Sequence, residues 1–114
     1  MDAAMFVEAI KRYVRDAAVE DTISNLKRPP GRRIPPKEKA RSDWFNGLSK
    51  TDANHVEDVV KDAVDEAIFG LFAVLDGSRV IEDGRFELSH VNEGRVLLNN
   101  PSSIGLNELF NAIE

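Results

Sequence analysis

The chain has 114 residues, of which 42% are apolar and 31% are charged, and its formal net charge is −5. This length and composition predict a single packed domain covering residues 1–114 and are not those of a disordered chain. The sequence contains no cysteine, which excludes disulfides, zinc–thiolate sites and cysteine nucleophiles.

The first residues do not resemble a signal peptide. Asp2 stands where a positive charge is typical, and Glu8, Lys11 and Arg12 interrupt the apolar residues that follow. The longest uncharged apolar stretch, residues 67–75, is far shorter than the ~20 residues that cross a bilayer. We therefore expect a cytoplasmic protein with no membrane partner.

Apolar spacing predicts a first helix from about Asp2 to about Asn25. One stripe contains Phe6, Ile10, Tyr13, Val14 and Ala17, and a second, on nearly the opposite face, contains Val19, Ile23 and Leu26. The change of face predicts that the end of this helix packs against a different element from its start. Pro29 and Pro30 then prevent the helix from continuing.

Residues 27–41, KRPPGRRIPPKEKAR, form a basic segment with seven cationic side chains and one acid, a net charge of +6. Because the whole chain carries −5, the remaining residues carry −11. The two proline pairs predict an extended crossover with polyproline geometry. Three roles are open for it: a structural crossover, a strip that docks a protein, and an arm that binds nucleic acid.

The next stretch, SDWFNGLS at residues 42–49, places two large aromatic residues beside each other. We expect a short helical turn, closed by Asn46-Gly47, that plugs one end of the core. Trp44 and Phe45 should both lie inside, because aromatic residues of this size carry much of a small core's burial.

The second helix is the clearest element of the sequence. Ser49 is a good N-cap, Asp52 completes a pattern like a capping box, and Gly77 ends the helix. From Phe69 onward the helix is apolar all round, which predicts burial on every side, with Leu71 and Phe72 almost fully buried. Gly70 suggests the close approach of another backbone. The surplus apolar face predicts a homodimer.

The last third of the chain changes to a β-type pattern. The runs SRVIE, RFELSHV and RVLLN predict a three-stranded antiparallel meander with turns at Asp83-Gly84 and at residues 92–94. A short C-terminal helix follows, with Leu106, Leu109, Phe110 and Ile113 on one stripe. The predicted fold class is α+β: two long helices joined by the basic crossover, the meander and the final helix.

No motif in the sequence indicates catalysis or a cofactor. Neither His55, expected to be exposed, nor His90, expected to be partly buried, has neighbours at metal-ligand spacing. The acids Asp58, Asp62 and Asp65 follow one face of the second helix and are interpreted as a solvated face. A further hypothesis is that Asp58 and Asp62 meet basic residues of segment 27–41. We predict no enzyme activity, no cofactor and no metal.

Four stretches together carry a resemblance: VEDTISNLKRPPGRR, WFNGLS, AIFGLFAVLDG and LLN before the final helix. With them, the chain resembles a family of small bacterial proteins with no assigned activity. The resemblance implies no catalytic or binding residue. In size and charge the chain is similar to immunity proteins and antitoxins, which bind a toxic enzyme.

The leading functional hypothesis is therefore a non-enzymatic protein-interaction module, inhibitor- or immunity-like, whose acidic body faces a basic protein partner. The alternative is a nucleic-acid-associated protein that binds through segment 27–41, which the charge of −11 elsewhere disfavours. The residues expected to contact a partner are Arg28, Arg32, Arg33, Asp58, Asp62 and Asp65.

Overall fold

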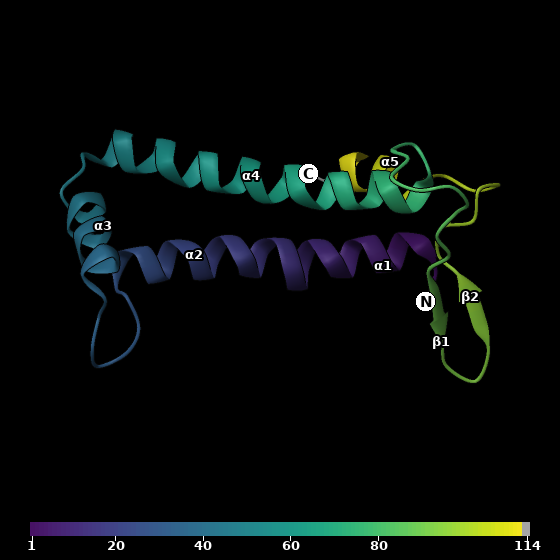
Figure 1. Cartoon of the computed structure of the whole chain (residues 1–114), viewed down its shortest axis with the longest axis horizontal. Coiled ribbons are helices and arrows are strands. Elements are labelled where there is room, and N and C mark those ends of the chain that lie inside the picture. Colours follow the sequence, from purple (N-terminus) through teal and green to yellow (C-terminus); the bar gives the residue numbers. More distant parts are fainter. Residues whose placement is uncertain (113–114) are drawn as a thin grey trace.

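Two long antiparallel helical arms form the body of the protein in the computed structural model, which describes residues 1–112 (Figure 1). The first arm consists of α1 (Ala3–Ile10), a π-helical turn η1 (Lys11–Asp16) and α2 (Ala17–Lys27). The backbone stays right-handed helical through Ile10 and Ala17, so these three elements continue one another. The second arm is α4 (Lys50–Asp76).

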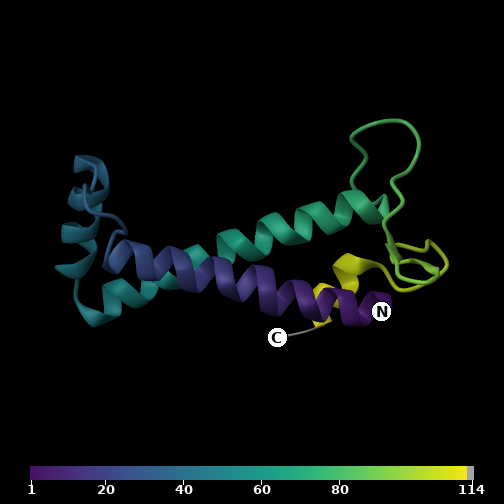
Figure 2. The ribbon, with the colours of Figure 1, turned by 90° about the horizontal axis from the view of Figure 1, so that it is seen from below.

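Smaller elements cover the two ends of this hairpin. The helix α3 (Pro36–Asn46) lies across one end, and α5 (Leu106–Ala112) packs between the arms at the other (Figure 2). At the same end as α5, strands β1 (Ser89–Val91) and β2 (Arg95–Leu97) pair antiparallel, with His90 opposite Val96. We call the two regions the α3 end and the α5 end.

The capping residues of the long helices agree with the sequence pattern. The Asp2 side chain accepts a hydrogen bond from the Met5 amide at 2.8 Å, and Ser49 Oγ accepts one from the Asp52 amide at 3.1 Å. Gly77 ends α4 with a φ of 84°, a left-handed conformation that favours glycine. The predicted limits of the second helix are thereby confirmed.

The main core lies at the α5 end. Its buried members are Val7, Phe72, Leu106 and Phe110. The Phe72 ring centroid lies 6.1 Å from that of Phe6 and 5.7 Å from that of Phe110, in tilted and edge-to-face arrangements. The backbone amides of Leu106 and Asn107 donate to the Asp76 carboxylate at 3.0 and 2.8 Å, so α4 also caps α5.

The molecule is elongated for its size. Its extents are 50 × 29 × 27 Å and its radius of gyration is 18.1 Å. A compact domain of this length would have a radius of about 13 Å. Two separated ends on a long hairpin therefore leave much of each arm's surface uncovered.

The predicted α+β class was wrong, because the protein is mostly helical and β1 and β2 are the only paired strands in the described residues. Residues 79–82 form no strand, and Val80 and Ile81 are exposed. The buried Asn99 side chain accepts from the Leu88 amide at 2.8 Å and donates to the Phe86 carbonyl at 2.8 Å. These bonds lie on the edge of residues 86–88 that faces β2, so Asn99 extends the β1–β2 pairing. The predicted first strand is absent because the chain turns back at the end of α4, where the Arg79 amide donates to the Ala73 carbonyl at 3.1 Å.

The extended crossover over residues 27–41 was wrong in its second half. Pro36 begins α3, because proline suits the first position of a helix and good helix formers follow it. The short turn expected at residues 42–49 is the last part of this helix. Phe45 is buried as predicted, whereas Trp44 points outward and is 56% exposed.

Burial of α4 on every side was also wrong. Phe72 is buried as predicted, but Leu71 is 58% exposed. A Cβ at Gly70 would lie 2.8 Å from the Arg79 guanidinium, so a side chain, not another backbone, approaches this glycine. The C-terminal helix was predicted correctly in kind, although Ile113 lies outside the described residues.

Candidate functional site: an open apolar face

An uncharged face runs along α4 on the side away from α5. Its members recur every three or four residues, and this spacing places them on one side of a helix. We call the following residues the open face: Val56, Val59, Val60, Ala63, Ala67 and Leu71 of α4, together with Thr22, Asn25 and Leu26 of α2. Ala63 and Ala67 are exposed, and Val59 is 66% exposed.

At the α3 end the open face deepens into a groove of about 510 Å³ between α2, α3 and α4. Leu26, Val56 and Val60 form its floor, with Pro29, Pro30 and the exposed Trp44 at its side. Glu38 and Arg41 of α3 supply charges at its edge. The groove therefore combines an apolar floor, one large aromatic side chain and a charged rim.

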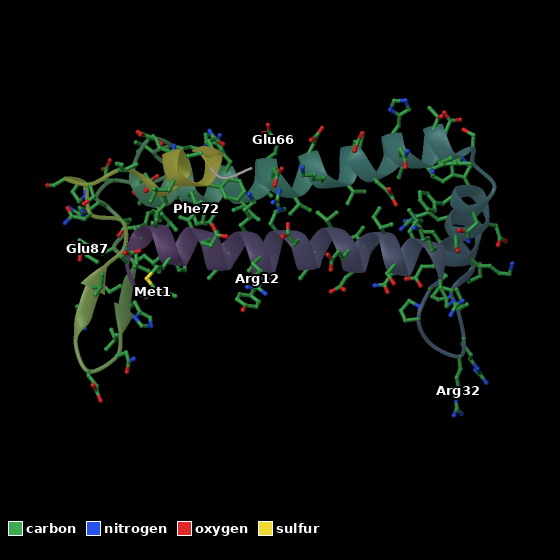
Figure 3. All side chains as sticks on the ribbon, turned by 180° about the vertical axis from the view of Figure 1, so that it is seen from behind. Met1, Arg12, Arg32, Glu66, Phe72 and Glu87 are labelled. Carbon is green, nitrogen blue, oxygen red and sulfur yellow. The ribbon has the colours of Figure 1, made fainter. Side chains whose placement is uncertain are left out.

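The three predicted arginines lie on the loop that joins α2 to α3. Arg28, Arg32 and Arg33 are all exposed, and Arg32 extends away from the body of the protein (Figure 3). The loop is held at its start by Ser42 and Asn46 of α3, whose side chains donate to the Lys27 carbonyl at 3.2 and 2.9 Å. The basic loop is thus presented to solvent beside the groove.

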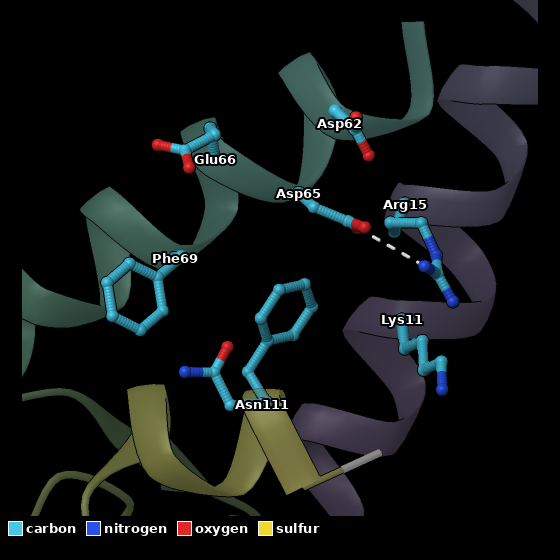
Figure 4. A pocket seen from close by; sticks show the side chains of 8 residues that line it. Lys11, Arg15, Asp62, Asp65, Glu66, Phe69 and Asn111 are labelled. Atoms are coloured by element: carbon cyan, nitrogen blue, oxygen red, sulfur yellow. Dashed lines mark hydrogen bonds and ion pairs between the residues drawn. The ribbon is translucent and has the colours of Figure 1, made fainter. Parts of the chain in front are cut away.

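The opposite side of the hairpin carries a charged cleft of about 470 Å³ between η1, α4 and α5 (Figure 4). Arg15 Nη1 donates to Asp65 Oδ1 at 3.2 Å, and Arg15 Nε forms an ion pair with Asp16. Asp62 and Glu66 line the same cleft. The buried Lys11 and Arg15 were not predicted, because the π-turn that shifts their positions leaves no recognisable signal in the sequence.

The structure separates the predicted acids from most of the basic segment. Asp65 pairs with Arg15 of η1, and Asp62 lies in the same cleft. Asp58 lines a second cleft with Lys27 and Arg28, and Lys27 Nζ lies 3.6 Å from Glu57 Oε1. The hypothesis named Asp58 and Asp62, but in the described residues the α4 acid that forms an ion pair with the segment is Glu57.

No group of three His, Asp or Glu side chains suited to a metal ion occurs within residues 1–112. His55 is exposed, and His90 is half-buried on β1. On α3, a hydrogen bond of 2.8 Å from Lys39 to Asp43, with the charge of that carboxylate, raises the pKa of Lys39. Both side chains of this pair are exposed.

In the part of the chain that the structure describes, no helix has both the length and the apolar character needed to cross a membrane. The sequence matches no family model, and no curated protein or solved structure is significantly similar to it. Its function is therefore inferred from the open face, the groove and the charges around them.

Proposed function

We propose that this chain is a non-enzymatic protein-interaction module that binds through its open face. Single exposed apolar residues are common on protein surfaces, but a continuous uncharged face is typical of an interface. Val59, Ala63, Ala67 and Leu71 provide such a face without an intervening charge. This continuity is the observation that carries the proposal.

The groove at the α3 end has the composition of an interface centre. Tryptophan is enriched among the side chains that dominate binding energy, and apolar centres are commonly surrounded by polar rims. Trp44 stands beside Leu26 and Val60, with Arg41 and Glu38 at the edge. A partner that inserts an apolar side chain here would bury Trp44 and keep its charges at the rim.

The charges support an inhibitor- or immunity-like role for this module. Asp58 lies on the side of α4 away from the open face, Asp62 and Glu66 flank that face, and all three belong to a body with a charge of −11. Such a surface attracts a basic protein and steers its approach. The small size and acidic charge of the chain are similar to those of immunity proteins.

Affinity capture with paired variants tests the proposal. Val59→Glu places a charge in the open face, whereas Asn54→Glu places the same charge on an exposed position on the opposite side of α4. A bound protein should be retained by wild type and Asn54→Glu and lost with Val59→Glu, while all three keep the same circular dichroism. Retention that is equal in all three would contradict binding through the open face.

Nucleic-acid binding is a second candidate, favoured by the exposure of Trp44. An exposed aromatic ring beside Arg41 and the basic loop could stack on a base while the arginines contact phosphates. The charge of −11 elsewhere opposes a polyanion. If Lys27, Arg28, Arg32 and Arg33 neutralise four phosphates, log K should fall with log salt at a slope of about −3 to −4.

The salt titration separates the two candidates. Replacing these four basic residues by Ser should abolish salt-sensitive binding of single-stranded or duplex nucleic acid if that is the function. Under the leading proposal, wild type shows no such binding at ~150 mM salt, a condition in which contacts to several phosphates would be measurable.

A further inference from the structure

We infer that the protein seated on the open face is a second copy of this chain, in an antiparallel two-fold dimer. The inference rests on the proposed function, because it takes the open face as the binding surface and names its occupant. Three features support it: the symmetry of the residues along α4, the charges of the two ends, and the size of the face.

The residues of α4 are arranged so that the open face is complementary to itself. A two-fold axis through the point midway between Val59 and Leu71 also lies midway between Ala63 and Ala67. In an antiparallel pair Ala63 of one copy therefore opposes Ala67 of the other, and Val59 opposes Leu71. Small residues at the centre let two helices approach closely, and larger residues fill the space on either side.

The charges at the two ends favour the antiparallel arrangement over the parallel one. Residues 27–46, at the α3 end, contain seven basic and two acidic side chains, and residues 76–112, at the α5 end, contain three basic and six acidic ones. An antiparallel dimer places the α3 end of one copy over the α5 end of the other, so opposite charges meet. A parallel dimer would bring two basic ends together.

The size of the face suits a weak, reversible dimer. From Val56 to Leu71 the face is about 22 Å long at 1.5 Å per residue, and two packed helices are about 20 Å wide. Each copy would therefore cover about 440 Å², or about 900 Å² for the pair, in the range of weak, transient interfaces. We expect a dissociation constant in the micromolar range.

The other side of the hairpin does not suit a second copy. It is occupied in part by α5, and the rest is the cleft where Asp62, Asp65 and Glu66 lie beside Lys11 and Arg15. Two copies stacked through this side would bring like acidic clusters together and bury charges that solvent now hydrates. The dimer through the open face instead leaves the acidic side outward, available to a basic partner.

Light scattering coupled to size exclusion gives the first test. Wild type at ~100 µM, well above a micromolar dissociation constant, should have twice the monomer mass of 12.7 kDa. Ala67→Glu should return it to the monomer mass with unchanged circular dichroism, because Ala67 is exposed and no packing is lost. The control Asn54→Glu, on the opposite side of α4, should remain dimeric. A wild-type monomer at this concentration would overturn the inference.

Single-cysteine variants test the orientation, since the chain has no cysteine of its own. Under mild oxidation a mixture of Val59→Cys and Leu71→Cys should form a disulfide-linked pair, while each variant alone should form little. Efficient self-linking of Val59→Cys alone would indicate a parallel dimer and contradict the inference.

The outcomes also distinguish this inference from the proposed function. If wild type is monomeric and still captures another protein, and Val59→Glu no longer captures it, the dimer is contradicted. The proposal of a protein-interaction module is then retained. A dimer that Ala67→Glu does not dissociate would place the interface elsewhere and overturn the inference. A monomer that captures nothing would contradict both.

Discussion

The α5 end and the α3 end of the same hairpin use their aromatic residues in opposite ways. At the α5 end Phe72 is enclosed by Phe6, Phe110 and the residues around them. At the α3 end Phe45 is buried but its neighbour Trp44 faces solvent beside a groove. The reason is geometric: α5 lies between the two arms, whereas α3 lies across their end (Figure 2).

This difference suggests that one end of the helix pair stabilises the fold and the other end binds. The α5 end supplies most of the folded state's stability, since its core joins α1, α4 and α5. The α3 end presents the groove and the basic loop, and between the ends the open face is left uncovered. Substitutions at the α5 end should therefore change stability, and substitutions at the α3 end should change association.

The largest expected effect is that of Phe72→Ala. Removing a buried aromatic side chain and leaving a cavity costs about 3–5 kcal/mol, a large fraction of the ~5–15 kcal/mol that stabilises a typical domain. Urea denaturation should show a much lower midpoint or an unfolded protein. Phe45→Ala at the α3 end should have a smaller effect, because that end can unravel without opening the main core.

A larger loss of stability from Phe45→Ala than from Phe72→Ala would contradict the assignment of most of the stability to the α5 end. Retention of the wild-type midpoint in Phe72→Ala would be a stronger contradiction, because it would require this side chain to lie outside the core.

Asn99→Ala is expected to cost about 2–3 kcal/mol, since it leaves buried backbone groups without partners. The Asn99 side chain donates to the carbonyls of Leu75 and Phe86 at 2.7 and 2.8 Å and accepts from the Leu88 amide. It therefore ties the end of α4 to the segment before β1. The measurement is thermal and urea unfolding together with amide hydrogen exchange of Leu88, which should become much faster.

Asn100→Ala provides the control for this effect. Asn100 is exposed and its side chain accepts one local hydrogen bond, from the Ser102 amide at 2.9 Å. Its replacement should change stability by less than ~1 kcal/mol. Equal effects from the two asparagines would show that the bonds of Asn99 do not hold this region together.

The sequence alone predicted the helical arms well because their signals are local. Ser49 and Gly77 mark the limits of α4, and the apolar spacing of 3 and 4 residues identifies its helix type. The same pattern failed to distinguish the buried Phe72 from the exposed Leu71. Both lie on apolar stripes, and only the position of the first arm and α5 decides which stripe is covered.

The predictions of a third strand and of an extended crossover were wrong for different reasons. Val80 and Ile81 have strand propensity, but they are exposed and form no strand. The chain turns back just before them, because the Arg79 amide donates to the Ala73 carbonyl at the end of α4. Pro36 was interpreted as part of an extended segment, although proline is equally suited to the first turn of a helix. Secondary-structure propensity is a property of the residue alone. Whether a strand or a helix forms at these positions also depends on the neighbouring residues in space.

The candidate site could be predicted in its charges but not in its geometry. Segment 27–41 was identified as the basic part of the chain, and Arg28, Arg32 and Arg33 do lie on an exposed loop. Its association with Trp44 was missed, because aromatic residues in a short turn are usually interpreted as core. The surplus apolar face of α4 was the one sequence signal that pointed to the open face.

Trp44 provides the smallest expected change in stability and a direct probe of association. Trp44→Ala should lower the free energy of unfolding by less than ~1 kcal/mol, since the side chain is 56% exposed. As the only tryptophan, it reports its own environment. Its fluorescence should be that of a solvent-exposed ring at nanomolar concentration and shift to shorter wavelength as the protein is concentrated, because an antiparallel second copy would cover the groove with the C-terminal part of its α4. Iodide quenching should fall over the same range in wild type and remain constant in Ala67→Glu. A short-wavelength spectrum that does not change on dilution would mean that Trp44 is buried within the monomer. The α3 end and the α5 end would then not differ in the burial of their aromatic residues.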